Sequence, residues 1–201
     1  MSSGPTYEVS LSGEFFANDL KAILNRITLH SESSSNIHTR EIVFEPLDAQ
    51  TQRENGLEPV LLRAKKELTE ENSPWELYSY LKPESARTYP DATVRPCANV
   101  DVFGDAPTFA AGLGYIKKTQ IYKRGYSFRR GPLMILMFQQ EQADPKTEKP
   151  IPAHADTLWE VEVKSFPLDT SNNKLIQEAI GRLLNVQMLM KGLLDLRRQD
   201  M

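Results

Sequence analysis

The sequence predicts a mainly antiparallel β protein of the α+β class, a single closed or nearly closed barrel flanked by an N-terminal helix and a long C-terminal helix. Three observations support this prediction. About seven segments have the length and alternation of strands, and they follow one another through hairpin-like links. Helices between successive strands are missing, which argues against a parallel βαβ sheet. Helical periodicity occurs at the two ends of the chain and in one short interior segment.

The N-terminal part predicts a short strand followed by an amphipathic helix. Tyr7–Leu11 alternates polar and apolar residues, and Ser12 and Gly13 are expected to end the strand. Apolar residues then recur at helical spacing, at Phe16, Leu20, Ile23, Leu24 and Ile27. The serine-rich segment His30–Asn36 is expected to be a loop.

The middle of the chain is dominated by strands. The candidate strands are Ile37–Phe44, Val60–Leu68, Trp75–Leu81, Thr93–Phe103, Tyr115–Phe128, Leu133–Gln140 and Leu158–Phe166. The polar segments Asp48–Glu58 and Lys82–Asp91 are expected to be loops. Asp105 is suited to cap a short helix that has Pro107 in its first turn. The charged, proline-bearing segment 142–152 is expected to be a mobile loop.

The C-terminal part predicts one long helix, Leu175–Leu196. Its apolar stripe consists of Ile176, Ile180, Leu183, Leu184, Met190 and Leu194. The strand Leu133–Phe138 is apolar on both faces, whereas an antiparallel strand often has one face in water. Both faces therefore need a cover. The closing helix and a partner chain are the two candidates for the outer cover.

Composition indicates a globular chain with one domain, residues 1–201. Hydrophobic residues make up 40% and charged residues 25% of the 201 residues, which is enough for one ordinary core. The net charge of −3 gives no support to nucleic-acid binding through overall charge. Cys97 is the single cysteine, which excludes an internal disulfide and favours a reducing compartment. With no secretory signal and no stretch of about 18 apolar residues, we expect a soluble intracellular protein.

The segment Leu61–Leu81 has the pattern of a hairpin whose first strand mixes cations with apolar residues. Arg63 and Lys65 share one face of this strand, and Lys66 shares the other face with Leu62. A simple sandwich core does not tolerate such cations, because a buried charge needs a partner. The pattern therefore favours a barrel with a partly polar lumen, in which the cations line the lumen or face a partner.

One acidic strand suggests chemistry. On a strand, Glu160, Glu162 and Lys164 point to one face. This arrangement resembles the triphosphate tunnel enzymes, in which glutamates hold a divalent cation and basic residues hold the triphosphate. The resemblance implies an alternative function, a metal-dependent triphosphatase or a triphosphate binder. An amphipathic strand with one wet face has the same pattern, and the N-terminal strand offers Glu8 alone. We therefore expect no catalytic residue, no metal site and no cofactor.

A basic, aromatic-rich stretch suggests a further alternative, a binder of single-stranded RNA. No acidic residue lies between Tyr115 and Gln140, and aromatic residues are interleaved with the cations, which would suit bases stacked on a sheet. The cations are Lys117, Lys118, Lys123, Arg124, Arg129 and Arg130. Adjacent residues of a strand point to opposite faces, so these cations do not form one patch. A solvated strand face or an acidic protein partner is the favoured interpretation.

Two blocks of the sequence resemble the subunit 18 family of the Mediator complex. The first joins Glu41–Leu47 to Leu61–Leu81, where a leucine-arginine-alanine-basic strand is followed by a spacer and a proline-tryptophan pair. The second is Leu113–Gln139, with a glycine, a basic strand, an aromatic residue flanked by Gly and Arg, a glycine turn and an apolar strand. The order and spacing of these blocks resemble a fungal member of the family over most of Glu41–Gln139.

The resemblance implies a barrel on the plan of the RNA triphosphatase tunnel fold and a non-catalytic, nuclear role in the head module of Mediator. The chain would act as an interaction scaffold that links regulators to RNA polymerase II and supports transcription initiation. The implied partners are Mediator subunit 20, which is a related barrel, the C-terminal helix of subunit 8, and RNA polymerase II through the complex. We expect neither membrane nor sequence-specific DNA contact. The expected partner-contact residues are Tyr122, Tyr126, Phe128, Leu133, Ile135 and Met137.

Overall fold

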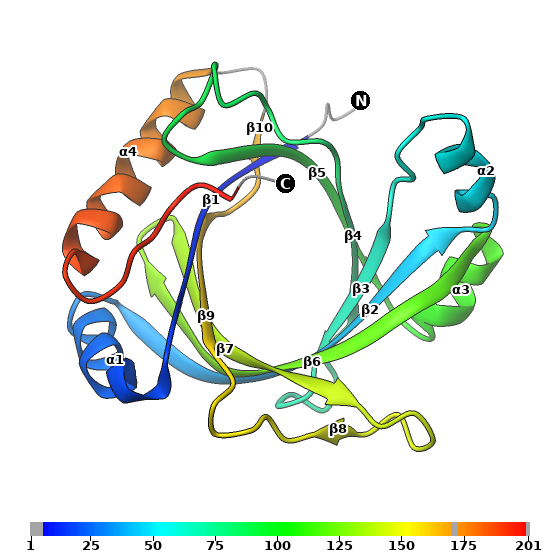
Figure 1. Cartoon of the computed structure of the whole chain (residues 1–201), viewed down its shortest axis with the longest axis horizontal. Helices are drawn as coiled ribbons and strands as arrows, with labels where there is room; N and C mark the ends of the chain where they lie inside the picture. The colour runs from blue at the N-terminus through cyan, green and yellow to red at the C-terminus, as the bar shows by residue number, and fades with distance from the viewer. Residues whose placement is uncertain (1–5, 170–172, 200–201) are drawn as a thin grey trace.

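The computed structural model describes residues 6–169 and 173–199, and these form a closed antiparallel barrel (Figure 1). Ten strands belong to one sheet, and eight of them close on themselves because β9 pairs with both β1 and β7. In order around the barrel, the eight are β1 (Thr6–Phe15), β5 (Thr93–Val102), β4 (Trp75–Tyr80), β3 (Leu62–Glu67), β2 (Ser33–Pro46), β6 (Tyr115–Arg130), β7 (Leu133–Ala143) and β9 (Trp159–Ser165). The short strands β8 (Pro150–Ile151) and β10 (Leu168–Asp169) pair with β7 and β1. The predicted fold class is confirmed.

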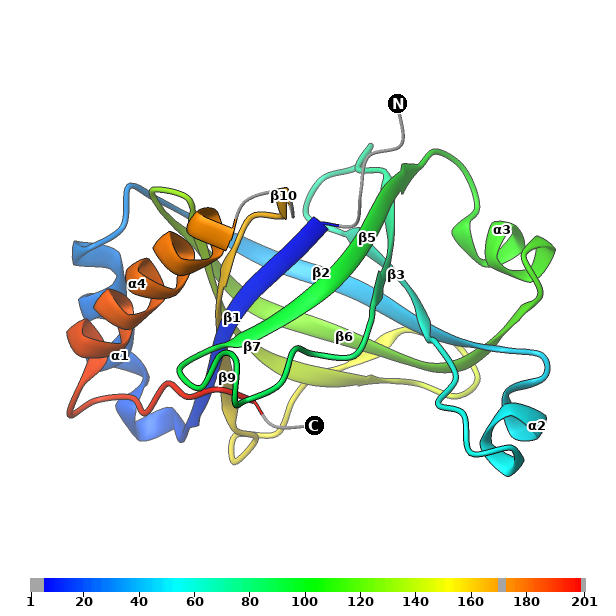
Figure 2. The same ribbon diagram turned by 90° about the horizontal axis from the view of Figure 1, so that it is seen from above.

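Helices cover the barrel from outside on two opposite sides (Figures 1 and 2). On one side lie α1 (Leu20–Leu29), which follows the 3-10 turn Ala17–Asp19, and α4 (Asn173–Met190). On the other side lie α2 (Ala49–Glu54) and α3 (Ala106–Gly112). In the part of the chain that the structure describes, no helix combines the length and the apolar character needed to cross a membrane.

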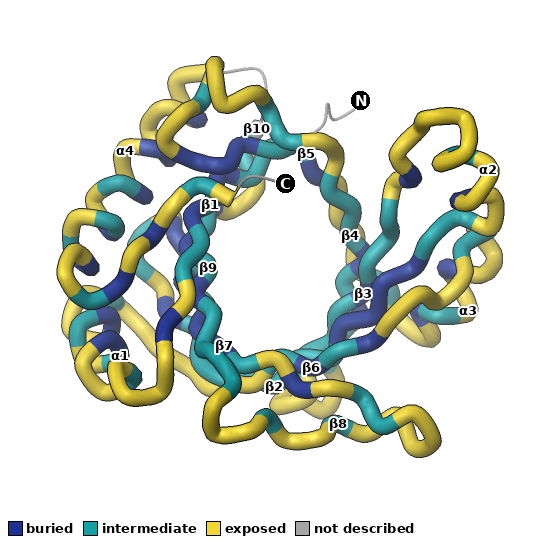
Figure 3. Tube along the Cα trace, viewed as in Figure 1, coloured by how far each residue is buried: buried dark blue, intermediate teal, exposed yellow. Residues whose placement is uncertain are grey.

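The larger hydrophobic core lies outside the barrel, between the sheet and the helices α1 and α4 (Figure 3). Val9 and Leu11 of β1 are fully buried on the outer face of the strand. Ile23 of α1 and Leu183 of α4 belong to the same core on the helix side, and both are fully buried too. The outward-facing core residues of the other strands include Phe128, Leu133, Ile135, Met137, Val161 and Val163. Burial of apolar surface therefore stabilises the barrel mainly from its outside.

A second, smaller core lies under α3. Its buried members are Ile42, Phe44, Ala64, Trp75, Leu77, Ala106 and Ala110. The helix begins as the sequence predicts, since the Asp105 side chain accepts a hydrogen bond of 3.2 Å from the Thr108 backbone N–H and Pro107 lies in the first turn. Both cores use the apolar face of each strand, so the alternate polar residues are left to line the lumen.

The first strand is longer than the sequence predicts. β1 continues through Ser12 and Gly13, because they pair with β9 opposite Glu162 and Val161. A Cβ atom on Gly13 would lie only 2.7 Å from the carbonyl oxygen of Asp195. The glycine thus serves a close approach of two backbone segments and not a turn, so the predicted strand end is wrong.

Three other predictions differ from the structure, and in the first of them strand pairing overrides local composition. β2 begins at Ser33, inside the predicted loop His30–Asn36, because the serines pair with β6. α2 forms within Asp48–Glu58, a segment also predicted to be a loop. α1 begins at Leu20, which leaves the predicted helix residue Phe16 64% exposed.

The C-terminal helix ends before the predicted Leu196. Gly192 has φ 85°, a left-handed conformation that ends helices. The segment beyond it runs back along β1, where Arg197 and Ser12 exchange two backbone hydrogen bonds of 2.9 Å. Leu194 is buried in this return segment and not in the helix that the periodicity predicts for it.

The segment 142–152 completes β7, turns, and returns as β8. Glu148 holds the turn against the barrel: its carboxylate lies 2.9 Å from Arg40 Nη2 and 2.5 Å from Lys117 Nζ. Its backbone carbonyl accepts a hydrogen bond from the Tyr122 hydroxyl at 2.5 Å. These contacts define the position of the loop, and its mobility stays a prediction.

Candidate protein-interaction site

The lumen is the first candidate site, because charged side chains from most of the strands point into it. A cavity of about 540 Å³ opens inside the barrel. Its charged lining residues are Glu41, Arg63, Lys65, Glu67, Glu76, Arg95, Asp101, Lys123, Glu162 and Lys164. Arg63 and Lys65 of the opening hairpin therefore line the lumen, one of the two positions that the sequence pattern allowed.

Glu41 lies at the centre of one charge cluster in the lumen. The residue is 3% exposed, and its carboxylate lies 3.0 Å from Arg63 Nη1 and 3.0 Å from Lys123 Nζ. Lys123 Nζ also lies 3.8 Å from Glu162. Burial alone would raise the pKa of Glu41, but Lys123 and Arg63 outweigh it and hold the pKa below its ordinary value. The carboxylate is therefore ionised at neutral pH and neutralises its two cations.

A second cluster joins Lys164 to Glu8. Lys164 Nζ lies 3.4 Å from the Glu8 carboxylate, to which the Tyr80 hydroxyl also donates a hydrogen bond of 3.0 Å. Burial would lower the pKa of Lys164, but Glu8 and its neighbours raise the pKa well above its ordinary value. Lys65 and Glu76 form a further pair at 2.9 Å. These lumen cations are matched by acids of the same chain.

The acidic strand that resembles a tunnel signature does face the lumen. Glu162 and Lys164 line the cavity, and Glu160, on the same face of β9, accepts a hydrogen bond of 2.7 Å from the Gln140 side chain. Burial raises the pKa of Glu160. Among residues 6–169 and 173–199, no group of three or more His, Cys, Asp or Glu side chains is placed to hold a metal ion. The described lumen thus lacks the carboxylate cluster with which a triphosphatase would hold its metal.

The basic stretch of β6 is dispersed over both faces of the sheet, as alternation predicts. Lys123 points into the lumen. Lys117 lies on the outside beside Glu148, and Arg124 Nε lies 2.7 Å from the buried carboxylate of Glu141. Pairing with acids leaves little of this stretch to form the positive stacking surface that single-stranded nucleic acid needs.

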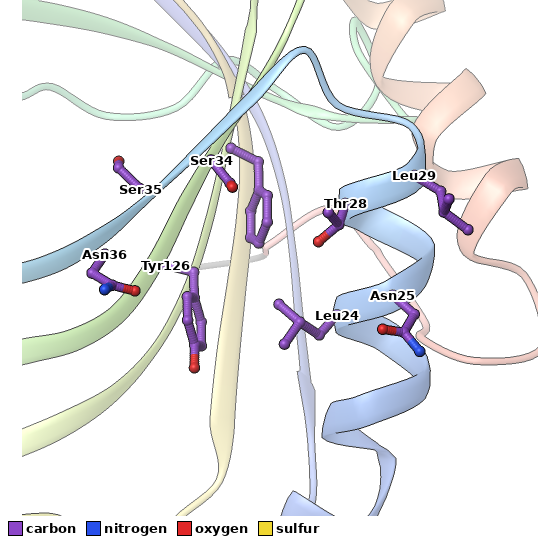
Figure 4. A pocket seen from close by; sticks show the side chains of 9 residues that line it. Leu24, Asn25, Thr28, Leu29, Ser34, Ser35, Asn36 and Tyr126 are labelled. Carbon is purple, nitrogen blue, oxygen red and sulfur yellow. The ribbon is translucent and has the colours of Figure 1, made fainter.

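A groove between α1 and the outer face of β2 and β6 is the second candidate site (Figure 4). Its volume is about 650 Å³. It is lined by Leu24, Asn25, Thr28, Leu29, Ser34, Ser35, Asn36, Tyr126 and Phe128. Leu24 and Thr28 point from α1 across the groove toward Tyr126. Leu29, at one end of α1, is 81% exposed. An exposed apolar residue beside an aromatic floor is suited to a protein partner.

Among the six residues predicted to contact a partner, Tyr126 is the most accessible. It is half-buried, lines the groove, and stacks on Trp159 with ring centroids 6.0 Å apart. The other five are at most 4% exposed: Tyr122, Phe128, Leu133, Ile135 and Met137. Leu133, Ile135 and Met137 of β7 lie in the outer core that also contains residues of α1 and α4, and Phe128 adds to the groove floor. Partner contact at Tyr122, Leu133, Ile135 and Met137 stays a prediction that requires the covering segments to move, and contact at Phe128 stays a prediction as well.

The two walls of the groove are the part of the site that sequence reasoning missed. The exposure of Leu29 could have been recognised from the sequence, because this residue lies off the buried face of α1 that Ile23 and Ile27 define. The wall formed by Ser34 and Asn36 could not have been recognised from the sequence, since serine-rich composition favours a loop.

The closed barrel, its charged lumen and its outer helices define a class of eight-stranded antiparallel barrel proteins with a polar interior. The fold is similar to that of a Pyrococcus horikoshii protein, with TM-score 0.60 and 13% identity over 96% of this chain and 94% of that chain. It is also similar to the triphosphatase of the Mimivirus capping enzyme, with TM-score 0.51 and 15% identity over 94% and 92% of the two chains. At such identities the similarity concerns the fold alone.

The particular family within this class is that of the Med18 protein, whose profile matches residues 7–201. The chain belongs to the Med18 family and is a non-catalytic subunit of the Mediator coactivator complex. Its structure is similar to a chain of the Schizosaccharomyces pombe Mediator head module, with TM-score 0.78 and 18% identity over 96% of this chain and 98% of that chain. The sequence matches none of the curated proteins with which it was compared. The predicted family is confirmed.

Proposed function

We propose that the protein is a nuclear interaction scaffold of the Mediator head module, which links regulators to RNA polymerase II and supports transcription initiation. The family match over residues 7–201 carries this proposal. The ion-paired lumen supports it, because acids of the same chain already occupy cations that a substrate would need. The scaffold uses the outside of the barrel and contacts neither membrane nor specific DNA sequences.

The proposed partners within the module are Mediator subunit 20, a related barrel, and the C-terminal helix of subunit 8. We place the helix in the groove between α1 and Tyr126. The groove has a rigid aromatic floor and an apolar wall at Leu24 and Leu29, which suits the apolar face of an amphipathic helix. Asn25 and Thr28 give the rim the polar groups that a partner helix also needs.

Assembly with purified head-module subunits tests this function. The wild-type chain is expected to co-elute with subunit 20 and with the subunit 8 helix. Thr28→Arg fills the groove from an exposed position, so it is expected to weaken binding of the helix by about tenfold or more. Gln177→Arg, which introduces the same side chain at an exposed position of α4 away from the groove, is the control and should bind normally.

The possible failures of this experiment have different meanings. A wild-type chain that does not assemble with head-module subunits contradicts the proposed function. If Thr28→Arg binds the helix as well as wild type does, the helix lies elsewhere on the barrel.

A further inference from the structure

Part of β2 has an edge that no strand of the described residues uses. β2 pairs with β6 along its whole length, from Ser33 opposite Arg129 to Pro46 opposite Tyr115. It pairs with β3 only over Thr39–Phe44. The strand therefore extends past β3 toward α1 with one paired and one unpaired edge (Figure 2).

The hydrogen bonds of His38 fix the direction of the free backbone groups. The His38 carbonyl accepts a bond of 2.8 Å from the Leu68 N–H, and the His38 N–H donates a bond of 2.9 Å to the Glu67 carboxylate. Both groups of His38 therefore point away from β6. Alternate residues of a strand point to the same edge, and the register between β2 and β6 is regular over this stretch. Ser34 and Asn36 thus direct one N–H and one C=O each to the unpaired edge.

Within the described part of the chain, residues 33–36 themselves carry no feature that discourages an approaching strand. Residues 33–36 are exposed, and they contain neither the lysine nor the proline with which natural edges discourage pairing. Ser34 lies opposite Phe128 and Asn36 opposite Tyr126, so the outer face of the edge adjoins the groove. Side chains from an added strand would therefore alternate between the groove side and the side of the lumen.

We propose that this edge binds an extended segment of a partner protein, which adds to the sheet as a further strand beside Ser34 and Asn36. An extended backbone is the occupant because it alone can pair with a row of strand-edge groups, whereas a helix has used its own. Apolar residues at alternate positions of the segment face the groove side. The inference rests on the proposed function, since the partner is another subunit of the head module.

Hydrogen exchange of single backbone amides, measured on the free chain and on the chain in the reconstituted head module, tests the proposal. In the free chain, the amides of Ser34 and Asn36 should exchange fast, and those of Ser35 and Ile37 slowly, because the latter two point toward β6. In the assembled module, the Ser34 and Asn36 amides should slow by about tenfold or more. Fast exchange in the module would overturn the proposal. Slowing that grows with the concentration of the free chain would overturn it too, by identifying a second copy as the occupant.

A proline variant tests the same edge by affinity. Asn36→Pro removes an edge N–H without removing a bond to β6, and edge strands tolerate proline. It should weaken assembly by about tenfold, the effect of one or two backbone hydrogen bonds, whereas Asn36→Ala keeps the N–H and should bind normally. If the wild-type chain does not assemble, the proposed function fails. If it assembles and Asn36→Pro assembles equally well, only the strand proposal fails. The exchange experiment on wild type decides the matter if the proline variant does not fold.

Discussion

Gly125→Ala is expected to cost more than about 3 kcal/mol of unfolding free energy, or to prevent folding. At this position β6 comes so close to β7 that a Cβ atom would lie 2.0 Å from the carbonyl oxygen of Met137 and 2.7 Å from the Cα of Phe138. Both obstacles are backbone atoms, so no side-chain rotation relieves the overlap. The two strands would have to separate, which breaks ladder hydrogen bonds next to the outer core.

Urea unfolding of Gly125→Ala, followed by circular dichroism, measures this effect. Gly181→Ala is the matched control, because a Cβ there meets nothing within 4 Å and the position is in helix α4. The control should be neutral or gain about 0.5–1 kcal/mol, since alanine favours a helix interior over glycine. Equal midpoints for wild type and Gly125→Ala would contradict the close approach of β6 and β7.

Glu41→Gln is the second change with a large expected effect, a loss of roughly 3 kcal/mol at neutral pH. The substitution keeps the shape of the side chain but removes the charge that Arg63 and Lys123 share within the lumen. Two neighbouring cations then lack their common counter-ion, and removing one member of a buried ion pair is more costly than replacing the whole pair. Glu178→Gln, on an exposed face of α4, is the control and should unfold like wild type.

The pH dependence of the same variant supplies an independent check. The folded pKa of Glu41 lies below its ordinary value of 4.5, so its contribution is fully present above that pH and is lost as pH falls through the folded pKa. The stability difference between wild type and Glu41→Gln should therefore be largest at neutral pH and shrink in acid, below about pH 4. A difference that stays constant from neutral to strongly acidic pH would mean that the variant acts through packing and not through charge.

Much of the fold was predictable, because alternation along the strands reports two different environments. The mixed faces of the hairpin predicted a polar lumen, and Arg63 and Lys65 do line it. The apolar outer face of Leu133–Phe138 predicted a cover, and Leu133, Ile135 and Met137 do lie in the outer core that contains residues of α1 and α4. These patterns are local and can be recognised in a single sequence, because the apolar face of a strand lies in an outer core and the polar face lies toward the lumen.

The parts that sequence reasoning missed depend on contacts between distant segments. Ser12 and Gly13 have turn-like composition, and only their pairing with β9 keeps them in a strand. The serines before Ile37 became a strand because β6 is long enough to pair with them. Leu194 fits the helical stripe of α4 by spacing, yet Gly192 ends the helix before it. The groove walls and the free edge of β2 arise from these same long-range arrangements.

Release of phosphate from inorganic triphosphate by the purified chain, with Mg²⁺ or Mn²⁺ added, tests the central claim most directly. The claim is that an eight-stranded barrel here serves as a scaffold, and that the charges in its lumen pair with one another and stabilise the fold. The account predicts no release above that of a protein-free control, and no difference between wild type and Glu160→Ala/Glu162→Ala. Metal-dependent release by wild type that the double substitution abolishes would contradict it.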